Sequence, residues 1–265
     1  MQGLEIPAQL LVVYCLVHLR FVGMMFTFPL FFTTASPVPF RFLCAVFLTV
    51  TAAGTLAESG EDFAVSMVLL ESWVPLLLMA LRELFIGAAL GLLAALPLVA
   101  LQVSGEQVSM AMGLSMASVM DPLMDRQTSI IGQLQFLIGL WFYFRWNGHL
   151  LLIQAVVESL RLLPPGRLSW IPAGDLSFGD WLSAVFDLAA KIVVPFYCAL
   201  LLADVGLGFL ARTVPQMNIF ILGLPVKIAL GFFVLAIVLP LAVEIVYAHL
   251  ERWVEFALQS SMVWR

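Results

Sequence analysis

The sequence predicts an all-α integral membrane protein. Of its 265 residues, 63% are hydrophobic and 11% are charged, whereas soluble domains contain about 45–50% apolar and about 25% charged residues. Long apolar runs recur along the whole chain, and its length permits about five to seven helical spans of about 20 residues each. The formal charge of −5 argues against nucleic acid as a partner, because nucleic-acid-binding surfaces are basic.

Three apolar helices are predicted in the first part of the chain. The first contains Arg20, and a charge at bilayer depth costs about 2.5–3.5 kcal/mol on insertion scales. Arg20 is therefore expected to face protein or to reach an interface. In the third helix, Gly87 and Gly91 form a G-x-x-x-G pattern, which lets another helix backbone come close. The three predicted helices cover residues 10–32, 40–56 and 73–101.

Residues 103–122 differ in composition from the apolar runs on either side. They combine small residues and hydroxyls with four methionines, a mixture too polar for lipid and too apolar for a solvated loop. Irregular backbone at membrane depth is tolerated only where protein buries it or where it lines a cavity. Methionine adapts to irregular or changing surfaces. Two interpretations follow: a movable closure inside a pore, or a small-residue helix that packs tightly on a neighbour.

The second part of the chain predicts four further apolar helices and a terminal one. Asn147-Gly148 is a turn signal, and residues 167–180 form the largest polar break. The tail, residues 250–265, is expected to form an amphipathic terminal helix. The four apolar helices cover residues 128–144, 150–163, 181–210 and 219–249.

Charged residues interrupt these apolar helices often. Asp187 and Lys191 are spaced to form an i,i+4 pair on one helix face. Intramembrane charges can form an ion path, as in transporters. Alternatively, the charged helices pack against other subunits, partly outside the lipid. The candidates for an ion path are Arg82, Glu83, Asp204 and Lys227.

The sequence contains no recognisable catalytic, cofactor-binding or metal-binding motif. No glycine-rich stretch is followed by the Lys-Ser or Lys-Thr of a phosphate-binding loop. His18, His149 and His249 are too dispersed for metal-ligand spacing, and no serine or cysteine lies in a nucleophile motif. An enzyme is therefore not expected, which leaves a channel, a transporter or a component of an assembly.

Three sequence blocks are informative when they are taken together. They are residues 105–122 (with G-E-Q, M-G-L-S and D-P), residues 146–150 (W-N-G-H-L) and residues 203–227 (with A-D-V-G-L-G, R-T-V-P-Q-M-N-I-F and G-L-P-V-K). In this order and spacing the blocks resemble the FliR family of flagellar biosynthetic proteins, and the resemblance covers nearly the whole chain. The counterparts of FliR in virulence-associated type III secretion are the SctT proteins, but the N-G-H-L turn is closer to the flagellar branch.

The resemblance implies a subunit of the flagellar type III export gate. Members of the family join FliP and FliQ as a single copy in a closed helical assembly, with which FlhB and FlhA associate. The assembly contacts membrane lipid in the bacterial inner membrane, lies within the flagellar basal body in part toward the periplasm, and conducts unfolded flagellar proteins. The alternatives are an SctT subunit of an injectisome and, from another class, a secondary transporter.

The resemblance also implies a division of the chain and a set of site residues. Residues 1–265 form one export-gate module, with a FliP-like part over 1–166, a FliQ-like helical hairpin over 181–249 and the terminal helix over 250–265. A loop over residues 105–122 enters the pore as a plug. The implied plug residues are Gly105, Glu106, Gln107, Met110, Met112, Gly113, Met116, Met120, Asp121 and Pro122. The implied subunit-packing residues are Gly87, Gly91, Asp204, Gly208, Pro215, Gly223 and Lys227.

Overall fold

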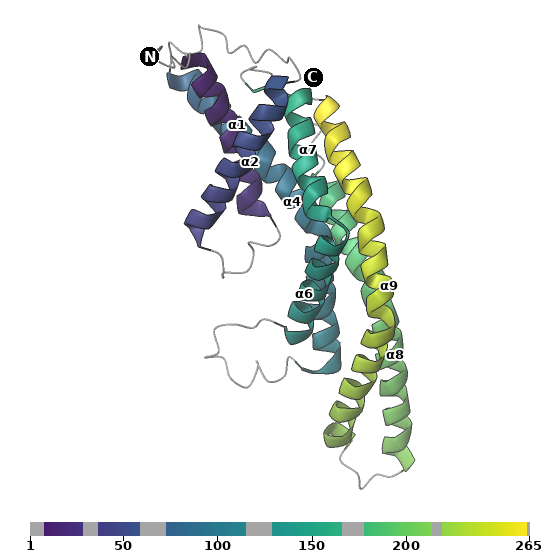
Figure 1. The fold of residues 1–265 in the computed structure, drawn as a ribbon. Coiled ribbons are helices and arrows are strands. Elements are labelled where there is room, and N and C mark those ends of the chain that lie inside the picture. Colours follow the sequence, from purple (N-terminus) through teal and green to yellow (C-terminus); the bar gives the residue numbers. More distant parts are fainter. Residues whose placement is uncertain are drawn as a thin grey trace. The chain divides into compact units, whose positions relative to one another are not determined.

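The described part of the chain is helical throughout, as the sequence predicts. The computed structural model describes residues 8–28, 37–58, 73–114, 129–165, 178–213 and 219–263, and these ranges contain helices and no strand. Figure 1 shows the helices along the chain. They are α1 (Ala8–Thr27), α2 (Val38–Glu58), α4 (Trp73–Met112), α6 (Ile130–Arg145), α7 (Gly148–Leu162), α8 (Phe178–Thr213) and α9 (Ile219–Val263).

Three of the described helices are long and apolar enough to cross a membrane. They are α4, the Leu182–Thr213 part of α8 and the Leu222–Ala248 part of α9. The apolar parts of α1 and α2, Leu11–Thr27 and Val38–Ala52, are shorter. Fewer helices of the described chain therefore reach spanning length than the apolar segments of the sequence suggested.

Two helices run further than predicted. α4 continues past Leu101 to Met112, and α9 continues without a break past residue 249 to Val263. Beyond Pro240 the α9 sequence contains neither proline nor glycine, the two residues that most disfavour a helix interior. The expected terminal helix is therefore the last part of α9.

The chain divides into two compact units, and each unit is built from segments that are separated in the sequence. One comprises residues 1–95, 147–177 and 250–265, and the other residues 96–146 and 178–249. The predicted division near residues 167–180 cuts the chain once, whereas α4 and α9 each contribute to both units. The first unit therefore combines segments of the predicted FliP-like part with the terminal helix, and the second combines residues 96–146 of the FliP-like part with the FliQ-like hairpin.

In the first unit, α1 packs on α2 and on α4. Gly23 of α1 lies against the α4 backbone at Leu84 and Ala88, and a Cβ at Gly87 would meet the backbone carbonyl of Arg20. One turn later, Gly91 lies against Thr27 of α1. The G-x-x-x-G pattern thus brings two backbones together, as predicted, and the second backbone belongs to the same chain.

In the second unit, α8 and α9 form a helical hairpin, drawn side by side in Figure 1. The second half of α4 packs on α6, where Gly139 lies against the side chains of Leu98 and Leu101. The turn signal that precedes α7 is confirmed, because Asn147 has a φ of 57°. That left-handed conformation is one that asparagine tolerates better than most residues.

Candidate functional site

The C-terminal end of α4 carries the described residues of the predicted plug. Residues 105–112 are helical, and the helix ends at Gly113, whose φ is 82°. The Gly113 amide donates to the Met110 carbonyl at 3.0 Å, and the Leu114 amide donates to the Ser109 carbonyl at 3.1 Å. These two bonds around a left-handed glycine form a Schellman motif. The helical backbone therefore extends beyond Gly105, where the sequence had placed the start of a loop.

Polar side chains within this part of α4 are buried and hydrogen-bonded. The Ser104 hydroxyl oxygen lies 2.7 Å from the Leu101 carbonyl oxygen in its own helix and 2.7 Å from Oε1 of Gln135 in α6. Ser104 and Gln135 are both buried. A serine that bonds its own helix backbone can be buried without leaving its hydroxyl unsatisfied. The polar composition of residues 102–112 is therefore compatible with a packed helix.

Two glycines set the close approach of α4 and α6. A Cβ at Gly105 would lie 2.5 Å from Cα of Gly132, so α4 has no room for a side chain at the crossing, and a Cβ at Gly132 would lie 3.0 Å from the Gln102 carbonyl oxygen. Ser129, the N-cap of α6, accepts a hydrogen bond from the Gly132 amide at 3.0 Å and donates to the Gly105 carbonyl at 3.4 Å. This geometry matches the interpretation of residues 103–112 as a small-residue helix packed on a neighbour.

The implied plug residues on α4 point in different directions. Met112 and Gly105 are buried, whereas Met110 is 60% exposed. Gln107 is also exposed, and its Oε1 accepts a hydrogen bond from the Tyr197 hydroxyl of α8 at 3.1 Å. Glu106 accepts from the amide of Gln102 in its own helix. The remaining implied plug residues, Met116, Met120, Asp121 and Pro122, lie outside the described residues.

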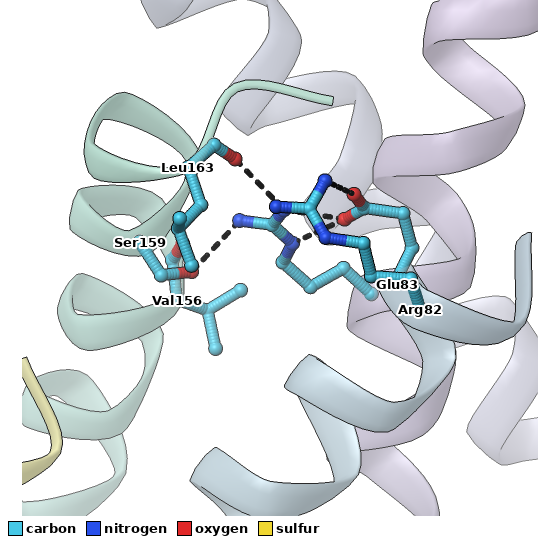
Figure 2. Close-up of polar contacts among 6 residues, drawn as sticks. Arg82, Glu83, Val156, Ser159 and Leu163 are labelled. Carbon is cyan, nitrogen blue, oxygen red and sulfur yellow. Dashed lines mark hydrogen bonds and ion pairs between the residues drawn. The ribbon is translucent and has the colours of Figure 1, made fainter. Parts of the chain in front are cut away.

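A second polar cluster lies inside the first unit, where Arg20 of α1 binds Glu83, Ser159 and Leu163. These three partners are labelled in Figure 2. The Arg20 Nε donates to Glu83 Oε2 of α4 at 2.6 Å, and Nη2 forms an ion pair with the same carboxylate. Nη1 donates to the Ser159 hydroxyl oxygen of α7 at 3.1 Å, and Nη2 donates to the Leu163 carbonyl at 2.9 Å. The Arg20 and Glu83 side chains are 0% and 1% exposed. The expectation that Arg20 faces protein is confirmed.

The end of α7 is well suited to accept the guanidinium. Leu163 is the C-cap residue of α7, and the last carbonyls of a helix lack partners within the helix and attract positive charge. The Ser159 hydroxyl donates its proton to the Val156 carbonyl at 2.6 Å, which leaves its oxygen free to accept from Arg20. Ser159 and Leu163 lie 139 and 143 residues from Arg20, and the sequence did not indicate either of them as a partner.

Several other charges of the described apolar helices also form ion pairs. Lys227 of α9 lies 2.5 Å from Asp204 of α8, so the third sequence block carries an ion pair that joins the hairpin. Lys191 and Asp187 are 2.6 Å apart on α8, as their spacing predicts. Arg82 Nη1 lies 3.9 Å from Glu83 Oε1. Within each unit, the carboxylates proposed for an ion path are thus bound to cations, an arrangement typical of structural pairs.

The implied subunit-packing residues occupy several settings. Gly208 faces open space, with no atom within 4 Å of an added Cβ, and at Gly223 that Cβ would lie 3.2 Å from Leu207 Cδ1. Pro215 lies outside the described residues. Around Gly208, α8 presents large apolar side chains to its surroundings. These are Leu201, Leu202, Val205, Phe209 and Leu210.

Comparisons with known proteins identify the family of the chain. The family model of bacterial export proteins, family 1, matches residues 11–253. The flagellar biosynthetic protein FliR of Bacillus subtilis (strain 168) is 32% identical over 84% of this chain and 85% of its own length. FliR of Aquifex aeolicus (strain VF5) is 27% identical over 95% of this chain and 96% of its own. The Yop proteins translocation protein T of Yersinia pestis is 31% identical over 61% of this chain and 63% of its own. The chain therefore belongs to the bacterial export proteins, family 1, as its resemblance to FliR predicted.

Proposed function

We propose that this chain is a subunit of the export gate of the flagellar type III secretion system. The observation that carries the proposal is the 32% identity to FliR of Bacillus subtilis over 84% of the chain. The family match over residues 11–253 supports it, since that range includes helices of both compact units. In this role the chain has no catalytic activity. It forms a conduit for unfolded flagellar proteins together with FliP and FliQ, next to FlhB and FlhA.

The proposed location is the bacterial inner membrane, within the flagellar basal body and in part toward the periplasm. Three helices of spanning length support a membrane location. The large apolar side chains that α8 exposes fit lipid or the apolar surfaces of neighbouring subunits. The Asp204–Lys227 pair on the same hairpin is partly exposed, and charge is costly against lipid. We therefore assign the part of the hairpin around this pair to contact with another subunit.

The proposed closure uses residues 105–122 as a plug. Its described part is the last turns of α4, where the Gly105–Gly132 crossing fixes the helix on α6. Met110 is the outward-facing methionine of this part, and its flexible side chain suits a deformable apolar seal. Gly113 ends the helix and gives the chain a change of direction at this point.

The composition of the purified complex tests the proposal. The tagged chain, co-expressed with the genes that neighbour its own and extracted in mild detergent, should appear by native mass spectrometry as one copy in a large heteromer. A stable monomer or homodimer would contradict an export-gate subunit and would favour a transporter. Deletion of residues 115–122 tests the plug separately. It should leave the heteromer intact and make the cell membrane leaky to small ions, and unchanged leakage with the heteromer present would exclude the plug.

The Asp204–Lys227 pair allows a second test of the subunit contact. Lys227→Ala leaves Asp204 without the cation that lies 2.5 Å away, so it should lower the yield of the heteromer more than it changes ion conductance. Lys191→Ala is the matched control, because the Lys191–Asp187 pair is more exposed and pairs of that kind contribute little. Normal heteromer yield together with altered conductance in the Lys227 variant would contradict the assignment.

A virulence-associated secretion apparatus is the second candidate. The Yop proteins translocation protein T of Yersinia pestis is 31% identical over 61% of this chain, which keeps this candidate open. The two functions differ in cargo. Restoration of motility in a strain that lacks its own FliR would support the flagellar function. Restoration of effector secretion alone, in a strain that lacks its own translocation protein T, would support the injectisome.

A further inference from the structure

The last residue of α4 is held in a notch of α9. The Met112 side chain is fully buried. At Gly231 of α9, an added Cβ would lie 2.6 Å from each of the Cγ, Sδ and Cε atoms of Met112. Met112 therefore fills the space that a side chain at position 231 would occupy. Glycine is unfavourable in a helix interior relative to alanine, so this packing gives a physical reason for glycine at position 231.

Two further contacts join the end of α4 to the α8–α9 hairpin. The Tyr197 hydroxyl of α8 donates to Gln107 Oε1 at 3.1 Å. A Cβ at Gly113 would lie 2.8 Å from Leu224 Cδ1 of α9. Contacts from both hairpin helices thus reach the last turns of α4, and all of these residues belong to the second compact unit.

Met110 and Met112 have opposite surroundings although they are two residues apart. Successive helical residues are rotated by about 100°, so side chains at i and i+2 point to nearly opposite sides. Met110 is 60% exposed and Met112 is 0% exposed. The two methionines are therefore suited to different functions although their side chains are chemically identical. Met110 can contact a passing or closing segment, whereas Met112 packs inside the unit.

We propose that Met112, seated against Gly231, is a positioning residue that fixes the end of α4 on the α8–α9 hairpin. In this arrangement the end of α4 stays in place while protein is exported, and any movement of the chain begins after Gly113. The inference rests on the proposed export function, because a fixed end of α4 affects function only if an exported protein moves past it.

A disulfide between positions 112 and 231 tests whether this contact is stationary. Cγ of Met112 is 2.6 Å from the Cβ position at residue 231, so the two Cβ atoms are no more than about 4 Å apart, within the range that a disulfide accepts. The variant Met112→Cys/Gly231→Cys is made in a full chain whose natural cysteines are replaced by alanine. It is expressed with its partners in a strain that is non-motile because its own FliR gene is deleted. Protection from a maleimide-polyethylene glycol reagent measures the cross-link.

We expect the cross-link to form in most chains. The export rate of the cross-linked protein should stay within twofold of the rate measured after the disulfide is reduced. Met110→Cys/Gly231→Cys is the geometric control and should not cross-link. The inference is overturned if the 112–231 pair does not cross-link, if the control pair cross-links equally well, or if oxidation stops export and reduction restores it. Failure of the cysteine-free chain to support motility would instead contradict the proposed function, while the cross-link could still be measured.

Alanine variants give an independent readout if the double-cysteine protein does not accumulate in cells. Gly231→Ala should displace Met112 and raise ion leakage at least threefold at unchanged heteromer yield. In a Met112→Ala background, the same substitution should add less than twofold, because the displaced side chain is absent. Wild-type leakage in Gly231→Ala, or equal effects in the two backgrounds, would show that Met112 does not act through this notch.

Discussion

Removal of the Arg20 side chain should destabilise the first unit strongly, and the reason is the carboxylate that remains. In Arg20→Met, the Glu83 carboxylate, whose side chain is 1% exposed, loses the guanidinium bound at Oε2 and keeps only Arg82, whose Nη1 lies 3.9 Å from Oε1. The Leu163 carbonyl and the Ser159 hydroxyl lose their bonds from the guanidinium, which are 2.9 Å and 3.1 Å long. Methionine preserves most of the apolar volume of arginine, so the effect reports the polar contacts.

The expected magnitude follows from these losses. Breaking a buried ion pair by removing one partner costs about 3–5 kcal/mol. The double variant Arg20→Met/Glu83→Gln carries neither charge and retains only the loss of hydrogen bonds, which costs about 1–3 kcal/mol. For a chain of this size each kcal/mol lowers the melting temperature by about 2–4 °C, so the single variant should melt roughly 6–20 °C lower and the double variant roughly 2–12 °C lower.

Thermal unfolding of the complex in mild detergent measures both values. The fraction of tagged chain that stays soluble after heating gives a midpoint for the wild type, the two single variants and the double variant. The four midpoints form a double-mutant cycle that isolates the interaction of Arg20 with Glu83. If Arg20→Met and the double variant melt at the same temperature, the Glu83 carboxylate left without Arg20 is not the source of the loss. A midpoint for Arg20→Met within 2 °C of the wild type would refute the structural role of the cluster.

Three further substitutions test local packing, and a fourth, Gly54→Ala, is a control. Gly87→Ala places a methyl group against a backbone carbonyl of α1 and should cost about 1–3 kcal/mol, whereas Gly54→Ala, in open space, should leave the melting temperature unchanged or raise it. Ser129→Ala removes the acceptor of the α6 N-cap bond and should cost about 1 kcal/mol, and threonine at this position should restore most of the loss. Gly113→Ala forces a side chain into the left-handed region and should cost about 1–2 kcal/mol. A wild-type melting temperature in Gly87→Ala, Ser129→Ala or Gly113→Ala would contradict the local geometry described for that residue.

The helices themselves were predictable from the sequence, because apolar runs bounded by polar breaks are a local signal. The predicted segment over residues 40–56 and α2 (Val38–Glu58), for example, differ by two residues at each end. The membrane class and the family followed from composition and from ordered motifs. The i,i+4 pair of Asp187 and Lys191 was also predictable, since both partners lie within one helix.

The partners of buried polar groups were not predictable in the same way. Arg20 binds atoms 63, 139 and 143 residues away, and no local pattern selects them. The same limit explains the end of α4. The predicted helix ended at Leu101, before a stretch of small residues and hydroxyls, but the hydroxyl of Ser104 in that stretch lies within hydrogen-bond distance of Gln135 on another helix. Whether a polar residue ends a helix or is buried in it depends on a partner that is distant in the sequence.

The distribution of small and large side chains explains why the stability of this chain should depend on contact with lipid or with other subunits. Glycines form the closest helix contacts, at the crossings of α1 with α4 and of α4 with α6, whereas large side chains such as Phe47, Leu202 and Phe209 are each about two-thirds exposed. In lipid, helices gain little by burying apolar groups against each other, so close backbone contacts and hydrogen bonds have to hold them together. The exposed aromatic and aliphatic side chains add stability only when lipid or another subunit covers them. The described helices therefore combine internal contacts that fix geometry with outer surfaces that supply binding energy, an arrangement suited to a subunit of a larger membrane assembly.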